Sequence, residues 1–310
     1  MNLAVRIGKL KLKNPVMLAS GTFGLEYDGL IDVNSLGAVV MKTITLRPRI
    51  GNPPPRIVET PSGMLNSIGL ENKGLDDFLK NKIPLLNKLK TAVVASIAGD
   101  DEDEFRELAR RLTKEERVNA LELNLSCPNL SRASGIGHRV SGERDIIGQD
   151  EKATYRIVKA VRKATGLTLI AKLSPNVTDI VKIAKAAQAA GADSISLVNT
   201  FLGMAVDIET KRPILGNVTG GLSGPAIKPL ALKFVRDVYK SVRIPIIGMG
   251  GVMDYKDAVE FILSGSSAVQ IGTGNFINPS AATQIIIGIR GYMRKHRIGD
   301  VKELIGALRL

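Results

Sequence analysis

Short runs of apolar and β-branched residues recur along the whole chain, and each is too short to be a buried helix. They predict eight strands, at residues 16–19, 38–43, 93–97, 120–125, 167–173, 194–198, 244–248 and 268–271. Segments with helical periodicity lie between them and predict helices over residues 75–89, 102–113, 152–164, 179–189, 225–242, 258–263 and 281–294, with a shorter candidate helix at 27–33. Gly191 and Gly265 follow two of these helices, where a left-handed C-terminal residue is expected.

Continuously apolar strands that alternate with helices indicate a parallel sheet whose outer face is covered. Eight such units are the number that closes a (β/α)₈ TIM barrel, so we predict an α/β fold with a single barrel domain over residues 1–310. The alternative is an open, doubly wound sheet. Two segments stand outside the repeat: residues 3–12 predict a hairpin that closes the bottom of the barrel, and residues 47–63, with three consecutive prolines, predict a long irregular insertion.

Composition narrows the class of protein. The chain has 310 residues, of which 44% are hydrophobic and 24% charged, which excludes disorder as its main state. Its net charge of +13 favours anionic ligands or an acidic partner surface. The single cysteine, Cys127, excludes an internal disulfide and an iron–sulfur cluster held by this chain alone. No apolar run is long enough to span a membrane and no signal-type segment is present, so we expect a cytoplasmic protein.

Several charged segments do not indicate a site. The acidic run at residues 100–104 is typical of a solvated helix start, and His138 and His296 lack metal-ligand spacing, so we predict no metal. A basic patch near the C-terminus comprises Arg290, Arg294, Lys295 and Arg297. Because the chain has no Trp, only 4% aromatic residues and no nucleic-acid motif, we interpret the patch as a solvated helix face or a contact for an acidic protein.

Polar residues lie at or just after the carboxyl end of most predicted strands. In a barrel of this kind the carboxyl ends of the strands and the loops after them form the working face, so this placement indicates an enzyme. These positions hold Ser20, Lys42, Thr43, Ser96, Asn124, Cys127, Lys172, Asn199 and Thr200, together with glycine-rich stretches at 248–251 and 272–274.

The last two loops are typical of a phosphate site. Gly250 and Gly251 follow the seventh strand, and Gly272 and Thr273 follow the eighth, where barrels commonly bind phosphate through backbone N–H groups. The alternative is that these glycines only make tight turns. Lys42 and Lys172, which end apolar strands, favour a bound anion, unless their ammonium groups simply reach solvent.

Cys127 lies among amides after the fourth strand. An isolated cysteine is usually a small buried hydrophobe, but in a polar loop on the working face it is a candidate base or nucleophile. Amide side chains suit a neutral heterocycle because each offers a donor and an acceptor. We therefore expect such a ring to be bound by Asn66, Asn124, Asn129 and Asn199.

These motifs resemble class 1 dihydroorotate dehydrogenase, especially its B-type catalytic subunit. The resemblance runs nearly end to end, and the matching stretches are residues 66–70, 124–129, 171–176, 199–200, 219–229, 248–251 and 271–276. The combination of Asn-Leu-Ser-Cys-Pro-Asn with Gly-Gly-Leu-Ser-Gly-Pro-Ala-Ile-Lys-Pro is highly specific, whereas Gly-Met-Gly-Gly occurs in many barrels.

The resemblance implies one FMN per chain and the oxidation of dihydroorotate to orotate in de novo pyrimidine (UMP) biosynthesis. A hydride would pass from substrate C6 to flavin N5, and Cys127 would take the C5 proton as general base. Lys42 would lie beside the flavin and the substrate carboxylate. Lys172 would stand near the pyrimidine edge of the flavin, where its charge favours the reduced, anionic cofactor.

The resemblance also implies two overlapping sets of contacts. The cofactor set is Ser20, Lys42, Thr43, Ser96, Asn124, Lys172, Val198, Gly224, Gly250, Gly251, Gly272 and Thr273. The substrate set is Lys42, Asn66, Ser67, Ile68, Gly69, Leu70, Asn124, Asn129, Asn199 and Thr200. Two features depart from the family pattern: Ser96 stands where B-type members carry Asn, and the stretch 130–149 is longer than usual. We hypothesise that this stretch closes over the substrate and excludes water.

The resemblance implies partners as well. B-type relatives form dimers of catalytic subunits and pass electrons to a second subunit that carries FAD and a [2Fe–2S] cluster, which gives a heterotetramer. The acceptor is open between NAD, fumarate and others, while Cys127 and the missing membrane segment argue against the quinone-dependent class 2. The alternatives are a dihydropyrimidine dehydrogenase-like flavoenzyme acting on dihydrouracil or dihydrothymine, a flavin-free lyase or isomerase, and a non-catalytic scaffold.

Overall fold

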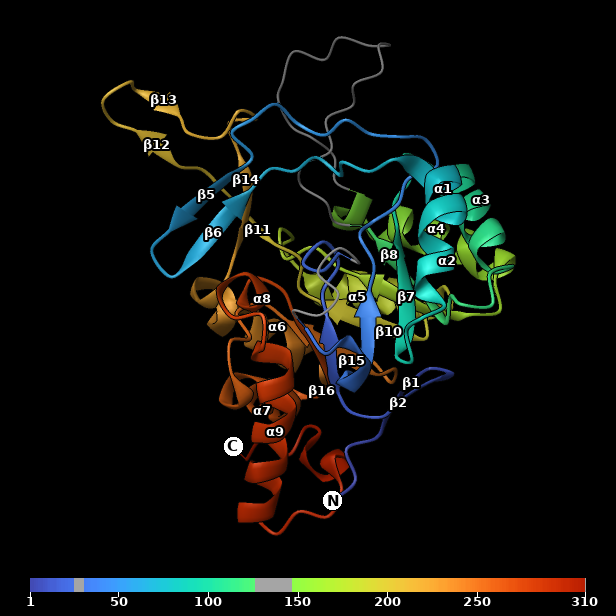
Figure 1. The fold of residues 1–310 in the computed structure, drawn as a ribbon, viewed down its shortest axis with the longest axis vertical. Helices are drawn as coiled ribbons and strands as arrows, with labels where there is room; N and C mark the ends of the chain where they lie inside the picture. The colour runs from blue at the N-terminus through green and yellow to red at the C-terminus, as the bar shows by residue number, and fades with distance from the viewer. Residues whose placement is uncertain (25–30, 126–146, 310) are drawn as a thin grey trace.

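Eight parallel strands close into a barrel in the computed structural model, which describes residues 1–24, 31–125 and 147–309 (Figure 1). Each strand pairs with the next along the chain, and β16 pairs with β3 to complete the circle. The predicted (β/α)₈ barrel is therefore confirmed and the open sheet is wrong. The strands are β3 (Val16–Leu18), β4 (Ala38–Val40), β7 (Ala92–Ile97), β8 (Ala120–Asn124), β9 (Thr168–Lys172), β10 (Ser194–Leu197), β15 (Ile246–Met249) and β16 (Ser266–Ile271).

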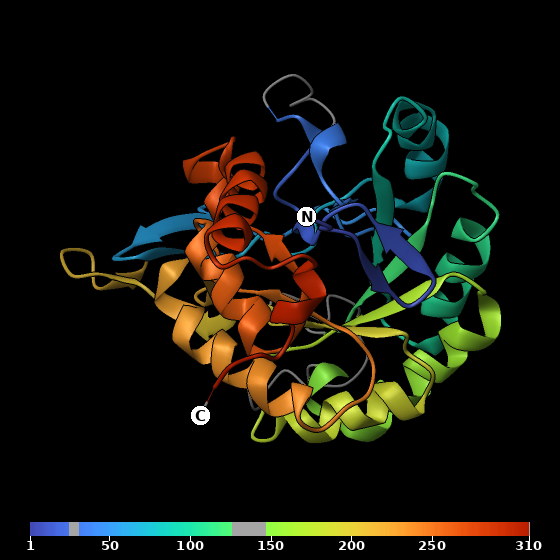
Figure 2. The same ribbon diagram turned by 90° about the horizontal axis from the view of Figure 1, so that it is seen from below.

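Helices surround the barrel and bury their apolar sides against it (Figures 1 and 2). The longer ones are α3 (Glu102–Leu112), α4 (Glu151–Ala164), α5 (Ile180–Ala189), α6 (Lys228–Tyr239), α7 (Tyr255–Ser264) and α9 (Ala281–Lys295). Short elements are α8 (Gly274–Ile277) and the 3₁₀ helices η2 (Val33–Ser35), η4 (Ile147–Gln149), η5 (Pro225–Ile227) and η6 (Val301–Leu304). None of the helices in the described ranges is both long and apolar enough to cross a membrane.

Local sequence explains where several helices begin, break and end. The predicted helix 75–89 is divided into α1 (Gly74–Asp77), a π-helical turn η3 (Phe78–Lys82) and α2 (Ile83–Leu86), because Pro84 cannot donate a backbone hydrogen bond to the preceding turn. Gly265 ends α7 at φ +127°, where a Cβ would lie 2.2 Å from Cγ of Tyr239. Of the candidate helix 27–33, residues 27–30 lie outside the described residues and residue 33 begins the 3₁₀ turn η2.

The N-terminal hairpin lies at the bottom of the barrel, as predicted. Strands β1 (Val5–Ile7) and β2 (Leu10–Leu12) pair antiparallel, and Val5, Ile7 and Leu12 are buried. The backbone N–H of Lys9 donates to Oγ1 of Thr168, the first residue of β9, over 3.0 Å. This contact ties the hairpin to the amino ends of the barrel strands, on the side seen in Figure 2.

A four-stranded antiparallel sheet stands beside the opposite end of the barrel (Figure 1). It comprises β11 (Phe201–Gly203), β14 (Gly220–Ser223), β6 (Gly63–Asn66) and β5 (Ile57–Thr60), and a two-stranded ribbon of β12 (Val206–Asp207) and β13 (Arg212–Pro213) projects from it. The predicted irregular insertion 47–63 is thus wrong over residues 57–60, which form β5, and at residue 63, where β6 begins. That run pairs with β6 after the prolines that interrupt the chain before it.

The acidic run at residues 100–104 serves as a helix start. The Asp101 carboxylate accepts hydrogen bonds from the N–H groups of Asp103 (3.0 Å) and Glu104 (2.9 Å), and three acidic residues occupy the first turn of α3. Across residues 1–24, 31–125 and 147–309, no group of three or more His, Cys, Asp or Glu side chains is placed to hold a metal ion.

Substitution Asp101→Ala removes this N-cap, so we expect the free energy of unfolding to fall by about 1 kcal/mol. Urea denaturation followed by circular dichroism measures the change. Asp103→Ala is the control, because the exposed Asp103 carboxylate caps no backbone group among the described residues and pairs with Arg106 on the helix surface, an interaction worth about 0.3–0.5 kcal/mol. Equal losses in the two variants would contradict the capping role.

Candidate active site

A pocket opens at the carboxyl ends of the barrel strands, beneath the antiparallel sheet. Its walls come from the loops after β3, β4, β10, β15 and β16, from the ends of β8 and β9, and from the sheet strands β6 and β14. Barrel closure therefore brings together side chains from the whole length of the chain, at the end where barrel enzymes carry their active sites.

Most residues predicted to contact a cofactor or substrate line this pocket. They are Ser20, Lys42, Thr43, Asn66, Ile68, Gly69, Leu70, Asn124, Lys172, Val198, Asn199, Thr200, Gly224, Gly250, Gly251, Gly272 and Thr273. Ser67 and Ser96 are fully buried and do not line it. Cys127 and Asn129 lie outside the described residues, as does residue range 130–146 of the long loop.

Hydroxyl and amide groups form a connected network across the pocket floor. Thr43 Oγ1 lies 3.1 Å from Ser20 Oγ and 2.9 Å from Ser96 Oγ. The Asn124 amide donates to Thr43 Oγ1 over 3.4 Å and accepts from Asn199 over 3.3 Å. Ser96 thus acts on the pocket through Thr43, which it supports from below.

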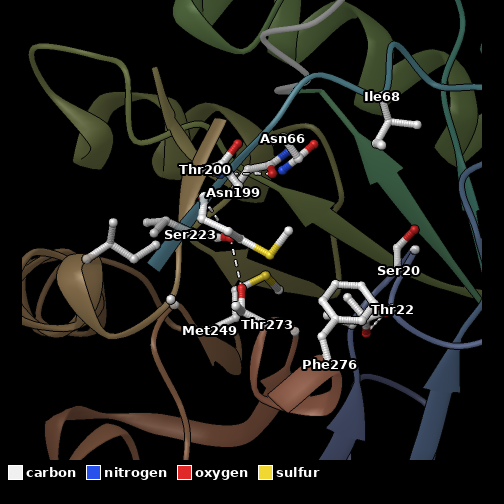
Figure 3. Close-up of a pocket in the computed structure, with 18 of the residues that line it drawn as sticks. Ser20, Thr22, Asn66, Ile68, Asn199, Thr200, Ser223, Met249, Thr273 and Phe276 are labelled. Carbon is white, nitrogen blue, oxygen red and sulfur yellow. Dashed lines mark hydrogen bonds between the residues drawn. The ribbon is translucent and has the colours of Figure 1, made fainter. Parts of the chain in front are cut away.

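The amide residues gather at one side of the pocket. Figure 3 shows Asn66, Asn199 and Thr200 close together, apart from Ser20 and Phe276. The Asn66 amide donates to the carbonyl of Gly221 in the neighbouring strand β14. These groups offer donors and acceptors in a partly buried space, which suits a polar ring.

The stretch 66–70 is held in place by Asn52, a residue that the sequence analysis missed. The Asn52 amide, 6% exposed, donates to Oγ of Ser67 over 3.0 Å, and its backbone N–H donates to the carbonyl of Ile68. Gly69 has φ +75°, and a Cβ there would lie 2.6 Å from the Asn52 nitrogen. Ser67 therefore anchors the pocket wall from behind.

The other side of the pocket is rich in glycine. Gly224 and Gly251 have φ +97° and +80°, a conformation that favours glycine, and a Cβ on Gly272 would meet no atom closer than 3.8 Å. Thr273 Oγ1 donates to Ser223 Oγ over 2.8 Å and joins the loop after β16 to β14 (Figure 3). Exposed backbone in such turns is suited to an anion.

A buried charged pair lies directly under the pocket. Glu122 on β8 is fully buried, and its Oε1 lies 3.9 Å from Nζ of Lys172 on β9. Its Oε2 accepts hydrogen bonds from Gln270 (2.8 Å) and Ser196 (3.3 Å). Since β8 and β16 are not neighbours in the barrel, the Gln270 bond crosses its interior. Glu122 and Gln270 were missed because each occupies a single position in a predicted apolar strand. The sequence signal was an acidic residue two positions before Asn124, on the same face of the strand.

Comparison with known proteins shows the family of this chain. A family model described as dihydroorotate dehydrogenase matches residues 2–293. The chain belongs to the dihydroorotate dehydrogenase family. It is 51% identical over 312 residues to the protein of Desulforamulus reducens named dihydroorotate dehydrogenase B (NAD(+)), catalytic subunit, and the match covers 100% of this chain and 99% of that one. The protein of the same name from Trichlorobacter lovleyi is 51% identical over 308 residues, or 99% and 98% of the two chains.

A solved structure supports the same assignment. The crystal structure of the dihydroorotate dehydrogenase of Eimeria tenella in complex with ferulenol is similar with a TM-score of 0.79 and 25% identity, over 98% of this chain and 88% of that one. The predicted resemblance to B-type catalytic subunits of this family and the oxidoreductase class are confirmed.

The pair of Glu122 and Lys172 generates a prediction about stability. Lys172→Met leaves the Glu122 carboxylate buried without its charged neighbour, so we expect the free energy of unfolding to fall by about 3–5 kcal/mol. The double variant Glu122→Gln with Lys172→Met removes both charges and should recover most of that loss. Urea denaturation of the flavin-free proteins measures both. Equal stability of the wild type and Lys172→Met would refute the pairing.

Proposed function

We propose that this chain oxidises dihydroorotate to orotate with bound FMN. The supporting observation is one pocket that joins a glycine-rich end, two lysines and an amide cluster, in a chain about half identical to dihydroorotate dehydrogenase B catalytic subunits over their full length. A flavin cofactor follows from the family, and the choice of FMN is part of the proposal.

The residues present fit FMN. The glycine-rich end, where positive φ angles at Gly224 and Gly251 and open space at Gly272 leave backbone groups accessible, suits the phosphate. Ser20, Thr43 and Lys172 offer polar contacts to the ring edges, and Met249 and Ile227 offer apolar surface. We assign the cofactor contacts to the full predicted set. Within it, Ser96 acts indirectly, through its hydrogen bond with Thr43, and Val198 lies in the pocket wall.

The reaction removes two hydrogens from adjacent carbons of the substrate ring. When bound, FMN supplies the acceptor for the hydride from C6. We assign the C5 proton to Cys127 as general base, which gives a C5–C6 double bond with atoms and charge in balance. Lys42 would neutralise the substrate carboxylate, while Asn66, Asn124, Asn129, Asn199 and Thr200 would orient the ring. The segment 67–70 would form the wall behind it.

We infer further that the chain works as the catalytic subunit of a larger enzyme, since its relatives carry that name. The proposed assembly is a homodimer that binds a subunit with FAD and [2Fe–2S] and gives a heterotetramer. Exposed apolar side chains lie on strand β11 and on the ribbon of β12 and β13 that follows it, among them Leu202, Met204, Val206 and Ile208. They offer a surface for a second copy of this chain. The acceptor is open between NAD, fumarate and others, and the cytoplasmic location stays a prediction.

The absorption spectrum of the purified chain under anaerobic conditions tests the proposal. We expect a flavin band that bleaches on addition of dihydroorotate and not of dihydrouracil, because only dihydroorotate carries the carboxylate that Lys42 would neutralise. Bleaching by dihydrouracil alone would favour the dihydropyrimidine dehydrogenase alternative. A colourless protein that FMN does not reconstitute would favour a flavin-free lyase, isomerase or scaffold.

The role of Cys127 has its own test. Cys127→Ala should slow flavin reduction by dihydroorotate at least about 10²-fold, as expected for the loss of a general base, while FMN stays bound. Stopped-flow absorbance measures the rate and the flavin spectrum measures occupancy. An unchanged rate would remove Cys127 from the mechanism.

A further inference from the structure

Lys228 lies directly behind the glycine turn of the pocket. It is the first residue of α6 and belongs to the Gly-Gly-Leu-Ser-Gly-Pro-Ala-Ile-Lys-Pro motif, yet it is not among the residues that line the pocket. A Cβ on Gly251 would lie 2.8 Å from Lys228 Cβ, 3.2 Å from its backbone nitrogen and 2.9 Å from the carbonyl oxygen of Gly224. The Gly251 backbone therefore rests against the start of α6.

The ammonium group of Lys228 extends away from this contact to α7. Nζ donates to Oδ1 of Asp257 over 2.6 Å and lies 2.9 Å from Oε2 of Glu260. The side chains of Lys228 and Asp257 are largely buried, 26% and 14% exposed, whereas Glu260 is 46% exposed. Partial burial alone would lower the pKa of Lys228, but the hydrogen bonds that it donates to Asp257 and Glu260, together with the charges of these carboxylates, hold that pKa above its usual value.

Asp257 binds the other end of the same turn. Its Oδ2 accepts hydrogen bonds from the backbone N–H groups of Met253 (2.8 Å) and Asp254 (3.2 Å), the residues that lead from the glycine turn into α7. One carboxylate thus joins α6, through Lys228, to the segment that follows Gly250 and Gly251. Those two glycines have φ +119° and +80°. Because glycine has no Cβ, it allows many backbone conformations, so the turn needs outside contacts to hold this one.

We propose that Lys228 and Asp257 form a clamp that holds the turn at Gly250 and Gly251 in its anion-binding conformation and so sets the affinity for the phosphate of FMN. The inference rests on the proposed function. Both residues are positioning residues, because neither lines the pocket and Nζ of Lys228 is engaged by the carboxylates of Asp257 and Glu260. Without the clamp the turn samples other conformations, and the apparent affinity falls with the fraction of chains that present the binding conformation.

Flavins with and without a phosphate separate this role from a general structural one. We expect Lys228→Met to raise the Kd for FMN about tenfold, as follows if the binding conformation is about a tenth as populated. The Kd for riboflavin, which has no phosphate, should stay unchanged. Fluorescence titration of the flavin-free full chain measures both values.

Matched variants complete the experiment. Lys233→Met removes an exposed ion pair with Asp237 from the same helix and should leave both affinities as in the wild type. Lys228→Arg keeps the charge and should retain most of the FMN affinity. Asp257→Asn alone should also raise the Kd for FMN. The double variant Lys228→Met with Asp257→Asn should have a Kd for FMN no higher than that of the weaker-binding single variant, because both substitutions break the same clamp.

Four other outcomes would overturn the clamp. Equal loss of FMN and riboflavin affinity in Lys228→Met, or unchanged FMN affinity, would overturn the clamp and leave the proposed function intact. A wild type that binds riboflavin as tightly as FMN would overturn it too, because the phosphate would then add nothing. A wild type that binds neither flavin would overturn the proposed function and the clamp with it.

Discussion

Closure of the parallel sheet between β16 and β3 is the constraint on which the rest of the structure depends. Once all strands run in the same direction around a circle, their carboxyl ends form one rim, and residues from Ser20 to Thr273 become neighbours. The N-terminal hairpin covers the opposite end, where Lys9 contacts Thr168. The pocket is therefore a consequence of topology before it is a consequence of any particular side chain.

The barrel interior is unusually polar beneath this rim. Barrels of this kind commonly fill their interior with branched apolar side chains, but here Glu122, Gln270 and Ser196 meet inside and Lys172 stands above them. Burying such groups is costly unless they satisfy one another. The Glu122 carboxylate lies 3.9 Å from the Lys172 ammonium group, which lines the pocket floor, so a buried negative charge faces the pocket's lysine from below.

Elements outside the barrel shape the remaining walls. The antiparallel sheet brings Asn66 against β14, and Asn52 fixes the stretch that follows it. On the other side of the pocket, the start of α6 packs against the turn at Gly250 and Gly251. The antiparallel sheet therefore supports one end of the pocket and α6 supports the other. This division agrees with the proposal that the phosphate of FMN binds at the glycine-rich end and the substrate ring at the amide end.

Local periodicity in the sequence was enough to predict the eight strands, most helices, the barrel and the bottom hairpin. Polar motifs after the strands predicted part of the pocket, and the family resemblance added further residues such as Ile68, Val198 and Gly224. The small sheet was missed, since its short strands combine residues 57–66 with residues 201–223, and such pairing has no local signal. The partners of Glu122 and Lys228, and the burial of Ser67 and Ser96 behind the pocket wall, were decided only by the tertiary structure. The physical reason is that contacts across a closed barrel, or between successive helices around it, depend on distances in space that sequence separation does not encode.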